Sequence, residues 1–419
     1  MERYKEYKKS VVPGMIEIPA HWKEILNGIL FKENVRKPDE NDIPLSLSQK
    51  DGLIPTDQMK ESSLKTSTYD NWKKVLKHDL VLNRFKAHLG VLMASDYEGM
   101  VSFHYGVYEP QLPLVTKYYE LLYHTDIYKG IYAYSSNGMT VGLQNLSNIV
   151  FYSIKGIYPP LAEQEKIVSY LEDKTSKIDA YVADKEKEIE LLQELKQKTI
   201  ADAVTKGLNP DAKMKDSGIS WIGEIPEHWE VRHLSQVSYE HYISNKEVHH
   251  QNLLSLSYGR IIRKDINTTE GLLPASFDTY QIVENGNIVM RLTDLQNDHK
   301  SLRVGLVKEE GIVTSAYVCL GVFDSMIPSY LYNVLHSYDI KKLFYSMGGG
   351  LRQNLNWQGL KKLDIPLPPK GEQQAIVAFI EEKCQKIDKL ASELQSEIDY
   401  LKEYKQRLIA DCVTGQVKV

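Results

Sequence analysis

Cysteine is scarce in this sequence of 419 residues, and its three copies lie far apart. Cys319, Cys384 and Cys412 are odd in number and form no CxxC pair, which argues against both a disulfide framework and a thiolate zinc site. The sequence has no run of about 18 uncharged apolar residues, and its charged start, Met1 to Lys5, precedes no apolar stretch. We therefore expect neither a membrane span nor a signal peptide, and a cytoplasmic protein.

A surplus of positive charge is missing as well. The chain has 51 Lys and Arg against 56 Asp and Glu, a net charge of −5, whereas proteins that bind nucleic acids usually carry a basic surplus. The negative excess is concentrated in two segments, because residues 159–207 carry 8 basic and 11 acidic side chains and residues 367–419 carry 8 and 9. Residues 1–158 and 208–366 together are therefore nearly neutral.

Signatures of catalysis are also absent. No GxxxxGK[ST] motif occurs, so nothing indicates an ATP-hydrolysing P-loop. The double prolines Pro159-Pro160 and Pro368-Pro369 lack the preceding Asp or Asn with which an adenine methyltransferase holds a flipped base. His249-His250 has no further ligands at metal spacing, and the carboxylates at Asp39-Glu40 and Asp211 lack the partners of a nuclease magnesium site. We expect no catalytic residue, no metal site and no cofactor in this chain.

What the sequence does contain is an internal repeat. Residues 159–207 align without a gap on residues 368–416, with roughly 22 identities over about 49 positions. Weaker matches extend upstream, where Gln144-Asn145-Leu146 pairs with Gln353-Asn354-Leu355 and the Ile-Pro-x-His-Trp segment ending at Trp22 pairs with the one ending at Trp229. Each half thus consists of a globular unit followed by a helical unit, and this plan fits ordinary domain sizes. We assign the recurring His-Trp pairs to packing.

The helical units predict a coiled coil. Their apolar residues recur at alternating spacings of three and four, which is the pattern of one narrow apolar seam. The seam residues are Ile178, Val182, Ile189, Leu192, Ile387, Leu394, Ile398 and Leu401. A double proline opens each helix, because proline is tolerated in the first turn. If the two helices pair antiparallel within one chain, the halves are related by a pseudo-twofold axis; a dimerising or purely structural coiled coil remains the alternative.

The globular units have short apolar or alternating runs broken by Gly, Asn, Asp and Pro, which favours mainly β structure with a few helices. Polar side chains that can contact base edges follow one such strand in each unit. They are Asn83, Arg84, Lys86 and His88 in the first unit and Arg291, Thr293, Gln296 and Asn297 in the second. A glycine-rich loop adds Arg352 as a candidate phosphate contact and Gln353 as a further DNA-binding candidate. Solvated turns after a strand would have the same composition.

The order Ile-Pro-x-His-Trp, Gln-Asn-Leu, Pro-Pro, Glu-Gln, Ile-Val and a long helix with Lys-Ile-Asp, present twice, resembles the DNA specificity subunit of type I restriction–modification systems. Its most specific part is the duplicated helix entrance, Pro159–Val168 and Pro368–Val377. The departures are modest: Tyr158 replaces an aliphatic residue, and the segment before Pro19 is shorter than its counterpart.

The resemblance implies an α+β fold with two target-recognition domains, at 1–158 and 208–366, and two helical regions, at 159–207 and 367–419, that form an intramolecular antiparallel coiled coil. Each recognition domain would bind one half of a bipartite, asymmetric site on double-stranded DNA. The implied partners are two methyltransferase subunits and two restriction and translocation subunits, which would use S-adenosylmethionine, ATP and magnesium.

Two alternatives remain at this point, a coiled-coil scaffold whose β modules bind proteins and an enzyme of unknown type. Since nearly neutral modules supply little phosphate affinity, we expect weak DNA binding by the chain alone and tight binding with the methyltransferase partners.

Overall fold

The computed structural model describes residues 2–49, 52–59, 69, 71–136, 145–247, 250–266, 276–295, 302–347 and 354–419. The contacts divide the chain into two compact units: unit 1 is Met1–Lys185 with Ser396–Val419, and unit 2 is Glu186–Gln395. Two long helices, α5 (Leu161–Lys206) and α10 (Lys370–Val413), therefore contribute one end to each unit. This division cuts through both long helices, whereas the boundaries predicted from the sequence lie where the helices begin and end. The predicted domain boundaries stay a prediction.

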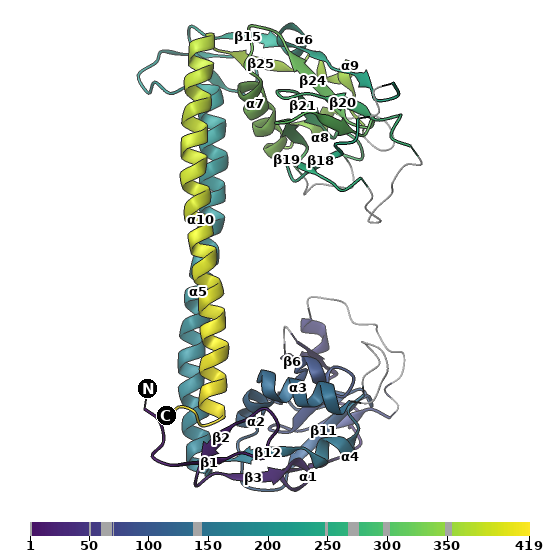
Figure 1. Ribbon diagram of the computed structural model, residues 1–419, viewed down its shortest axis with the longest axis vertical. Helices are drawn as coiled ribbons and strands as arrows, with labels where there is room; N and C mark the ends of the chain where they lie inside the picture. The colour runs from purple at the N-terminus through teal and green to yellow at the C-terminus, as the bar shows by residue number, and fades with distance from the viewer. Residues whose placement is uncertain are drawn as a thin grey trace. The chain divides into compact units, whose positions relative to one another are not determined.

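The centre of unit 1 is a four-stranded antiparallel sheet in the order β4-β11-β8-β9, of which β11 is labelled in Figure 1. Its strands are β4 (Phe31–Glu33), β11 (Tyr105–Pro110), β8 (Leu80–Asn83) and β9 (Leu92–Ala94). Two-stranded antiparallel pairs join β1 (Tyr7–Lys9) to β2 (Glu17–Pro19), β3 (Lys23–Leu26) to β12 (Lys155–Tyr158), β5 (Leu45–Ser48) to β6 (Gly52–Pro55) and β7 (Lys73–Val75) to β10 (Gly99–Val101). The short helices are α1 (Asn27–Leu30), α2 (Thr116–Tyr123), α3 (Asp126–Ser135) and α4 (Asn148–Ser153).

Unit 2 repeats this plan with a four-stranded antiparallel sheet in the order β16-β24-β21-β22. Its strands are β16 (Ser238–Glu240), β24 (Val318–Val322), β21 (Ile288–Met290) and β22 (Val304–Leu306). A three-stranded sheet contains β17 (Ile243–Ser244), β20 (Gln281–Val283) and β23 (Gly311–Val313), and pairs form between β13 (Met214–Asp216) and β14 (Glu224–Pro226), β15 (Glu230–His233) and β25 (Asp364–Leu367), and β18 (Leu254–Ser257) and β19 (Arg260–Arg263). The helices are α6 (Leu234–Val237), α7 (Pro328–Ile340), α8 (Leu343–Met347) and α9 (Trp357–Leu360).

The two central sheets are equivalent. In unit 1, β8 precedes the loop with the candidate base-contacting residues and pairs with β11 on one side and β9 on the other. In unit 2, β21 precedes the corresponding loop and pairs with β24 and β22 in the same way. The repeat is therefore present in the fold of the globular units as well, although their sequences diverge most. All of these pairings are antiparallel, a point that the sequence pattern left open.

The core of unit 1 is rich in tyrosine. Tyr118, Tyr119, Tyr123, Tyr128 and Tyr132 are fully buried, and burial raises the pKa of their phenols. Several satisfy their hydroxyls internally, as when the Tyr123 hydroxyl donates to Asn27 Oδ1 at 2.7 Å. The tyrosine excess of the sequence thus serves packing here, because the rings fill core volume while the hydroxyls of Tyr118, Tyr123 and Tyr128 donate to acceptors inside the unit.

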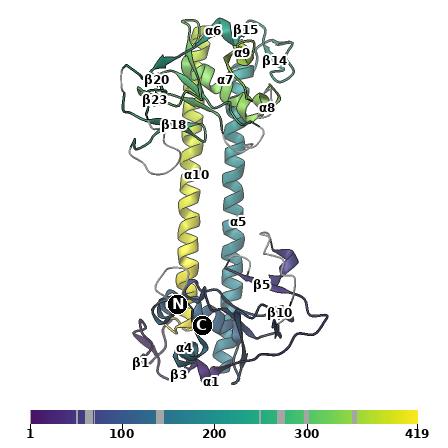
Figure 2. The same cartoon turned by 90° about the vertical axis from the view of Figure 1, so that its right-hand side faces the viewer.

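Within each unit the ends of α5 and α10 pack antiparallel (Figures 1 and 2). In unit 1 the Nζ atom of Lys405 lies 2.6 Å from Asp179 Oδ1, and in unit 2 the Nζ atom of Lys196 lies 2.6 Å from Asp388 Oδ1. Among the seam residues, the side chains of Val182, Ile387, Leu394 and Ile398 are buried, and those of Ile178, Ile189, Leu192 and Leu401 are half-buried. The apolar stripe therefore faces the partner helix in both units.

Candidate nucleic-acid interface

In unit 1 the loop after β8 begins with a side-chain-capped turn. Asn83 Oδ1 accepts hydrogen bonds from the backbone nitrogens of Phe85 and Lys86 at 3.1 and 3.2 Å. This is the local hydrogen bonding that favours Asn at turns. The turn fixes the backbone that carries Lys86, whose side chain is exposed. His88 lies half-buried just beyond it in a short 3₁₀ helix, Ala87–Leu89.

Arg84 does not project outward with Lys86. Its Nη2 atom lies 2.5 Å from Glu33 Oε1 and 2.8 Å from Asn148 Oδ1. Lys73 donates to the same Glu33 oxygen at 2.8 Å, so two cations share one poorly exposed carboxylate. Burial opposes ionisation of Glu33, but the hydrogen bonds from Lys73 and Asn148 and the charge of Arg84 outweigh it and lower its pKa. The Arg84 guanidinium is thus engaged inside the module by Glu33 and Asn148, and we do not assign it to DNA contact.

Beside this turn lies an exposed aromatic cluster that the sequence analysis missed. Phe85 and Phe103 are 41% and 51% exposed. The ring of His104 lies 5.8 Å from that of Phe85 and 3.9 Å from that of Phe103, measured between centroids. Phe103 and His104 belong to the turn before β11, whose first residue, Tyr105, pairs with Asn83. We call Phe85, Phe103 and His104 the aromatic tip. No sequence signal distinguishes such rings from core phenylalanines.

In unit 2 one buried arginine donates hydrogen bonds to the backbone of the equivalent loop. Arg303 is fully buried, and its guanidinium donates to the carbonyls of Arg291, Thr293 and Asp294 at 3.1, 3.0 and 3.4 Å. Asp294 has a φ of 57°, in the left-handed region, and its backbone nitrogen donates to Asn354 Oδ1 at 2.9 Å. Such contacts hold the backbone of the loop in place, so that the half-buried Arg291 and Thr293 side chains start from defined positions.

The same backbone hydrogen bond joins two predicted elements in both units. Leu146 N donates to Arg84 O at 3.0 Å in unit 1, and Leu355 N donates to Leu292 O at 2.9 Å in unit 2. The leucine of each Gln-Asn-Leu motif is therefore bound directly to the loop that follows β8 or β21. Gln296, Asn297, Arg352 and Gln353 fall outside the described residues, although Asn354, the next residue, is placed beside the loop.

The His-Trp pairs do more than pack. Glu163, in the first turn of α5, accepts from Trp22 Nε1 at 3.0 Å and lies 2.7 Å from His21 Nε2. Glu372, in the first turn of α10, is bound in the same way by Trp229 at 2.9 Å and His228 at 2.6 Å. Burial alone would raise the pKa of Glu163, but its hydrogen bonds from Trp22, His21 and Tyr4 lower it. We call each set of Trp, His and Glu a clasp, since it ties a module to the start of its helix.

The neighbouring glutamines complete this attachment. Gln164 Oε1 accepts from Val115 N at 3.0 Å, and Gln373 Oε1 accepts from Ile327 N at 2.8 Å. Their amide nitrogens donate to Pro159 O and Pro368 O at 2.8 and 3.0 Å. Both glutamines are fully buried, so a substitution would leave polar groups without partners. The duplicated Glu-Gln motif is therefore explained by how the module joins the helix.

Two classes of site are not found in the part of the chain that the structure describes. No group of three or more His, Cys, Asp or Glu side chains is arranged to hold a metal ion. No described helix is both long and apolar enough to cross a membrane.

Comparisons with known proteins agree with the sequence motifs. A family model for the type I restriction modification DNA specificity domain matches residues 24–191 and 303–400. The chain is 26% identical over 295 residues to the type I restriction enzyme MjaVIII specificity subunit of Methanocaldococcus jannaschii, and the alignment covers 66% of this chain and 65% of that protein.

Two solved structures share the fold. One is a chain from a structure describing complex assembly and conformational transition of a type I R-M system, with a TM-score of 0.71, 15% identity, and coverage of 96% of this chain and 99% of that one. The other is the crystal structure of the HsdS subunit from Thermoanaerobacter tengcongensis, with a TM-score of 0.56, 14% identity, and coverage of 97% and 100%. Because the family model spans more than half of the sequence, this chain belongs to the family of DNA specificity subunits of type I restriction–modification systems, whose task is to recognise a DNA sequence.

Proposed function

We propose that each unit binds one half of a bipartite, asymmetric DNA site, and that the pair formed by α5 and α10 sets the spacer between the halves. The chain itself performs no catalysis and binds no cofactor. It docks two methyltransferase subunits along the helices and modules, and two restriction and translocation subunits join them. S-adenosylmethionine, ATP and magnesium are used by those partners.

The observation that carries this proposal is that the two units share one backbone arrangement around this loop but have different side chains on it. Both units join the loop after β8 or β21 to the leucine of the Gln-Asn-Leu motif through the same backbone hydrogen bond. The side chains on that arrangement differ: unit 1 offers Lys86 and the aromatic tip, and unit 2 offers Arg291 and Thr293. Hydrogen-bonding groups that contact base edges specify sequence, so two different loops on one backbone arrangement suit two different half-sites.

Chemistry at the unit 1 loop fits duplex DNA. Lys86 can neutralise a phosphate, which contributes affinity without sequence preference. Exposed rings next to such a lysine can insert between base steps and kink the duplex, at a cost of a few kcal/mol that the additional contacts offset. We therefore assign the aromatic tip to DNA contact in unit 1.

Variants of the aromatic tip test this assignment in the assembled complex of this chain with its methyltransferase subunits. Phe85→Ala and Phe103→Ala should each weaken binding to the DNA site that the complex methylates by roughly tenfold, in the range expected for the loss of one contact between a ring and a base. Tyr134→Ala, in α3, removes an exposed ring elsewhere on the same unit and should leave binding unchanged. Equal loss with all three variants, or loss with none, would reject the assignment.

The spacer is tested by lengthening both helices. Tyr181 donates to Glu397 Oε1 at 3.0 Å, so one heptad inserted after Val182 is matched by one inserted after Glu397. The double insertion should change the spacer of the methylated site and leave both half-sites as they were. An unchanged spacer would refute the role of the helices as the ruler.

A further inference from the structure

The two clasps differ by one residue that comes from the start of each repeat. In unit 1, β1 pairs with β2 so that Tyr7 lies opposite Pro19, and in unit 2, β13 pairs with β14 so that Met214 lies opposite Pro226. Because Pro19 and Pro226 belong to the matching Ile-Pro-x-His-Trp segments, Tyr7 corresponds to Met214. Three residues earlier, Tyr4 of unit 1 therefore corresponds to Asp211 of unit 2.

In unit 1 the ring of Tyr4 covers the clasp. Its hydroxyl donates to Glu163 Oε2 at 2.9 Å. The ring centroid lies 5.5 Å from that of His21 and 5.7 Å from that of Trp22. Glu163 thus accepts from three side chains, and Tyr4 supplies both a hydrogen bond and an aromatic surface.

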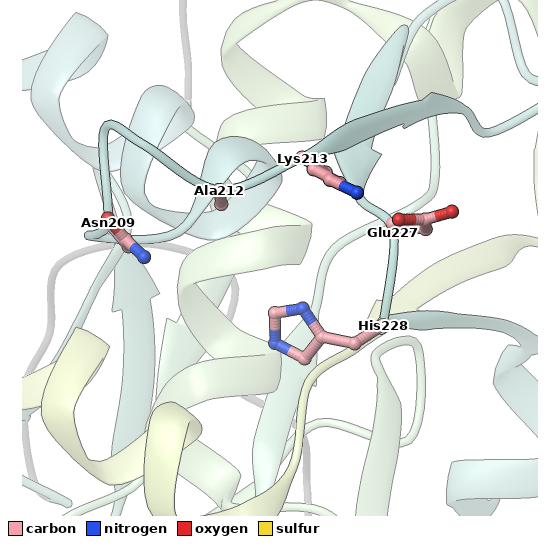
Figure 3. Close-up of a pocket in the computed structure, with 5 residues that line it drawn as sticks. All are labelled: Asn209, Ala212, Lys213, Glu227 and His228. Atoms are coloured by element: carbon pink, nitrogen blue, oxygen red, sulfur yellow. The ribbon is translucent and has the colours of Figure 1, made fainter.

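In unit 2 the corresponding place is a pocket. The Asp211 backbone donates to Asn209 Oδ1 at 3.0 Å in a turn that leaves the Asp211 side chain exposed. The pocket has a volume of about 400 Å³ and is lined by Asn209, Ala212, Lys213, Glu227 and His228. Figure 3 shows the His228 imidazole pointing into the space bounded by Asn209 and Lys213.

This lining is the unit 2 counterpart of the residues that neighbour Tyr4 along the chain and across the strand pair. By the same register, the five lining residues correspond in order to Glu2, Lys5, Glu6, Ala20 and His21. Among these counterparts His21 packs against the Tyr4 ring, so the pocket lies against the unit 2 equivalent of a residue that Tyr4 covers in unit 1.

The acceptor for a phenol is also in place. Trp229 and His228 bind Glu372 with the geometry of the unit 1 clasp, but among the described residues no third side chain donates to Glu372. The Glu372 side chain is 42% exposed, against 28% for Glu163. A carboxylate oxygen can accept more than one hydrogen bond, so Glu372 Oε2 retains the capacity that Glu163 Oε2 uses for Tyr4.

We propose that this pocket binds the side chain of a tyrosine presented by a partner protein, with the phenol hydroxyl donating to Glu372 and the ring against the His228 imidazole. Tyr4 argues for a protein as the source, because in unit 1 the ring arrives on a peptide segment that leads into β1. The pocket is then a docking point that unit 2 offers to a partner and that unit 1 closes with its own chain. The proposal does not depend on how either unit binds DNA.

A titration of the full chain with p-cresol, the side-chain analogue of tyrosine, tests the pocket without DNA or partner subunits. In the protein labelled at histidine, NMR signals of His228 should shift saturably and those of His21 should not move. Toluene lacks the hydroxyl and should bind roughly tenfold more weakly, because a hydrogen bond to a charged group is lost. Equal response of both histidines, or no response at His228, would overturn the proposal.

Tyr4→Ala provides the matched control. Removing that ring should open a second site, so that p-cresol now shifts His21 as well as His228. If Tyr4→Ala unfolds the first strand pair, the wild-type comparison of p-cresol with toluene still decides the matter.

A peptide copying residues 2–9 distinguishes the two sources of a phenol. It should shift the His228 signals, and the same peptide with Tyr4→Phe should bind several-fold more weakly. Binding of p-cresol without binding of the peptide would assign the pocket to a small phenolic molecule and overturn the protein-partner part. Loss of DNA recognition in other variants would leave all of these outcomes unaffected.

Discussion

The Nζ atom of Lys196 lies 2.6 Å from Asp388 Oδ1 in unit 2, and the Nζ atom of Lys405 lies 2.6 Å from Asp179 Oδ1 in unit 1. In unit 2 the lysine comes from α5 and the aspartate from α10, and in unit 1 the reverse holds. Lys196 corresponds to Lys405 and Asp179 to Asp388 in the gap-free alignment of the two helical segments. Each pair crosses from one helix to the other. A cross-pairing of this kind follows from antiparallel packing of two copies of one sequence, and it sets the helix register in both units.

Reversing one of these pairs should destabilise its unit modestly. Lys196→Asp places two carboxylates together and should cost about 1 kcal/mol, in the range of partly exposed ion pairs. Adding Asp388→Lys to Lys196→Asp should restore most of that loss. Urea denaturation of the single and double variants measures the coupling, and strictly additive losses would contradict a register-setting contact.

Arg84 and Lys86 should separate stability from DNA binding, although they lie two residues apart. Arg84→Ala leaves Glu33 with one cation fewer and should lower the free energy of unfolding by about 2 kcal/mol. Lys86→Ala should change stability by less than about 0.5 kcal/mol, as is usual for exposed residues, and weaken DNA binding uniformly across sequences. The checks are urea denaturation and DNA titration at two salt concentrations. A stability loss with Lys86→Ala would contradict its assignment to the surface.

Unit 1 should lose stability in acid through Glu33. Its pKa is lower in the folded protein than the ordinary value of 4.5, so the folded state favours the ionised form. The stabilisation is fully present above that ordinary value and is lost as the pH falls through the lowered one. Denaturation followed between pH 7 and pH 3 should therefore show a smaller decline in Glu33→Gln than in wild type. The exposed Glu98→Gln variant should follow wild type; if Glu33→Gln does so too, the argument is wrong.

Arg303 should control the loop that carries Arg291 and Thr293. Arg303→Leu leaves three carbonyls without their donor and should cost about 3 kcal/mol. Backbone amides of residues 291–295 should exchange hydrogen faster, and the half-site bound by unit 2 should become less selective. Arg303→Lys keeps the charge but loses the several donors of the guanidinium, so its stability and amide exchange rates should lie between those of wild type and Arg303→Leu. Unchanged exchange in Arg303→Leu would show that the loop is held by other contacts.

The family and the α+β fold could be predicted because they depend on local patterns repeated in the sequence. The helix entrances at Pro159 and Pro368 and the three-four spacing that includes Ile398 are such patterns, and the comparisons confirm the family. The locations of the recognition residues stay predictions. Arg84 shows why: its partner Glu33 lies 51 residues away, so nothing in the segment around Arg84 indicates that its charge is already paired.

The clasps and the aromatic tip were missed for the same reason. His21 and Trp22 bind a glutamate more than 140 residues away, and Phe85 meets His104 only because β8 pairs with β11. Antiparallel pairing brings together side chains whose separation in sequence follows no period. Such contacts could be derived from the fold and not from composition or spacing.

The central claim is that two modules with one backbone arrangement recognise two independent half-sites, and a module exchange tests it most directly. Residues 1–158 are replaced by the corresponding segment of another specificity subunit, the chain is assembled with its methyltransferase subunits, and the methylated adenines in genomic DNA are mapped by sequencing. The account predicts that one half-site changes while the other half-site and the spacer stay the same. Methylation of a site in which both halves have changed, or neither has, would contradict it.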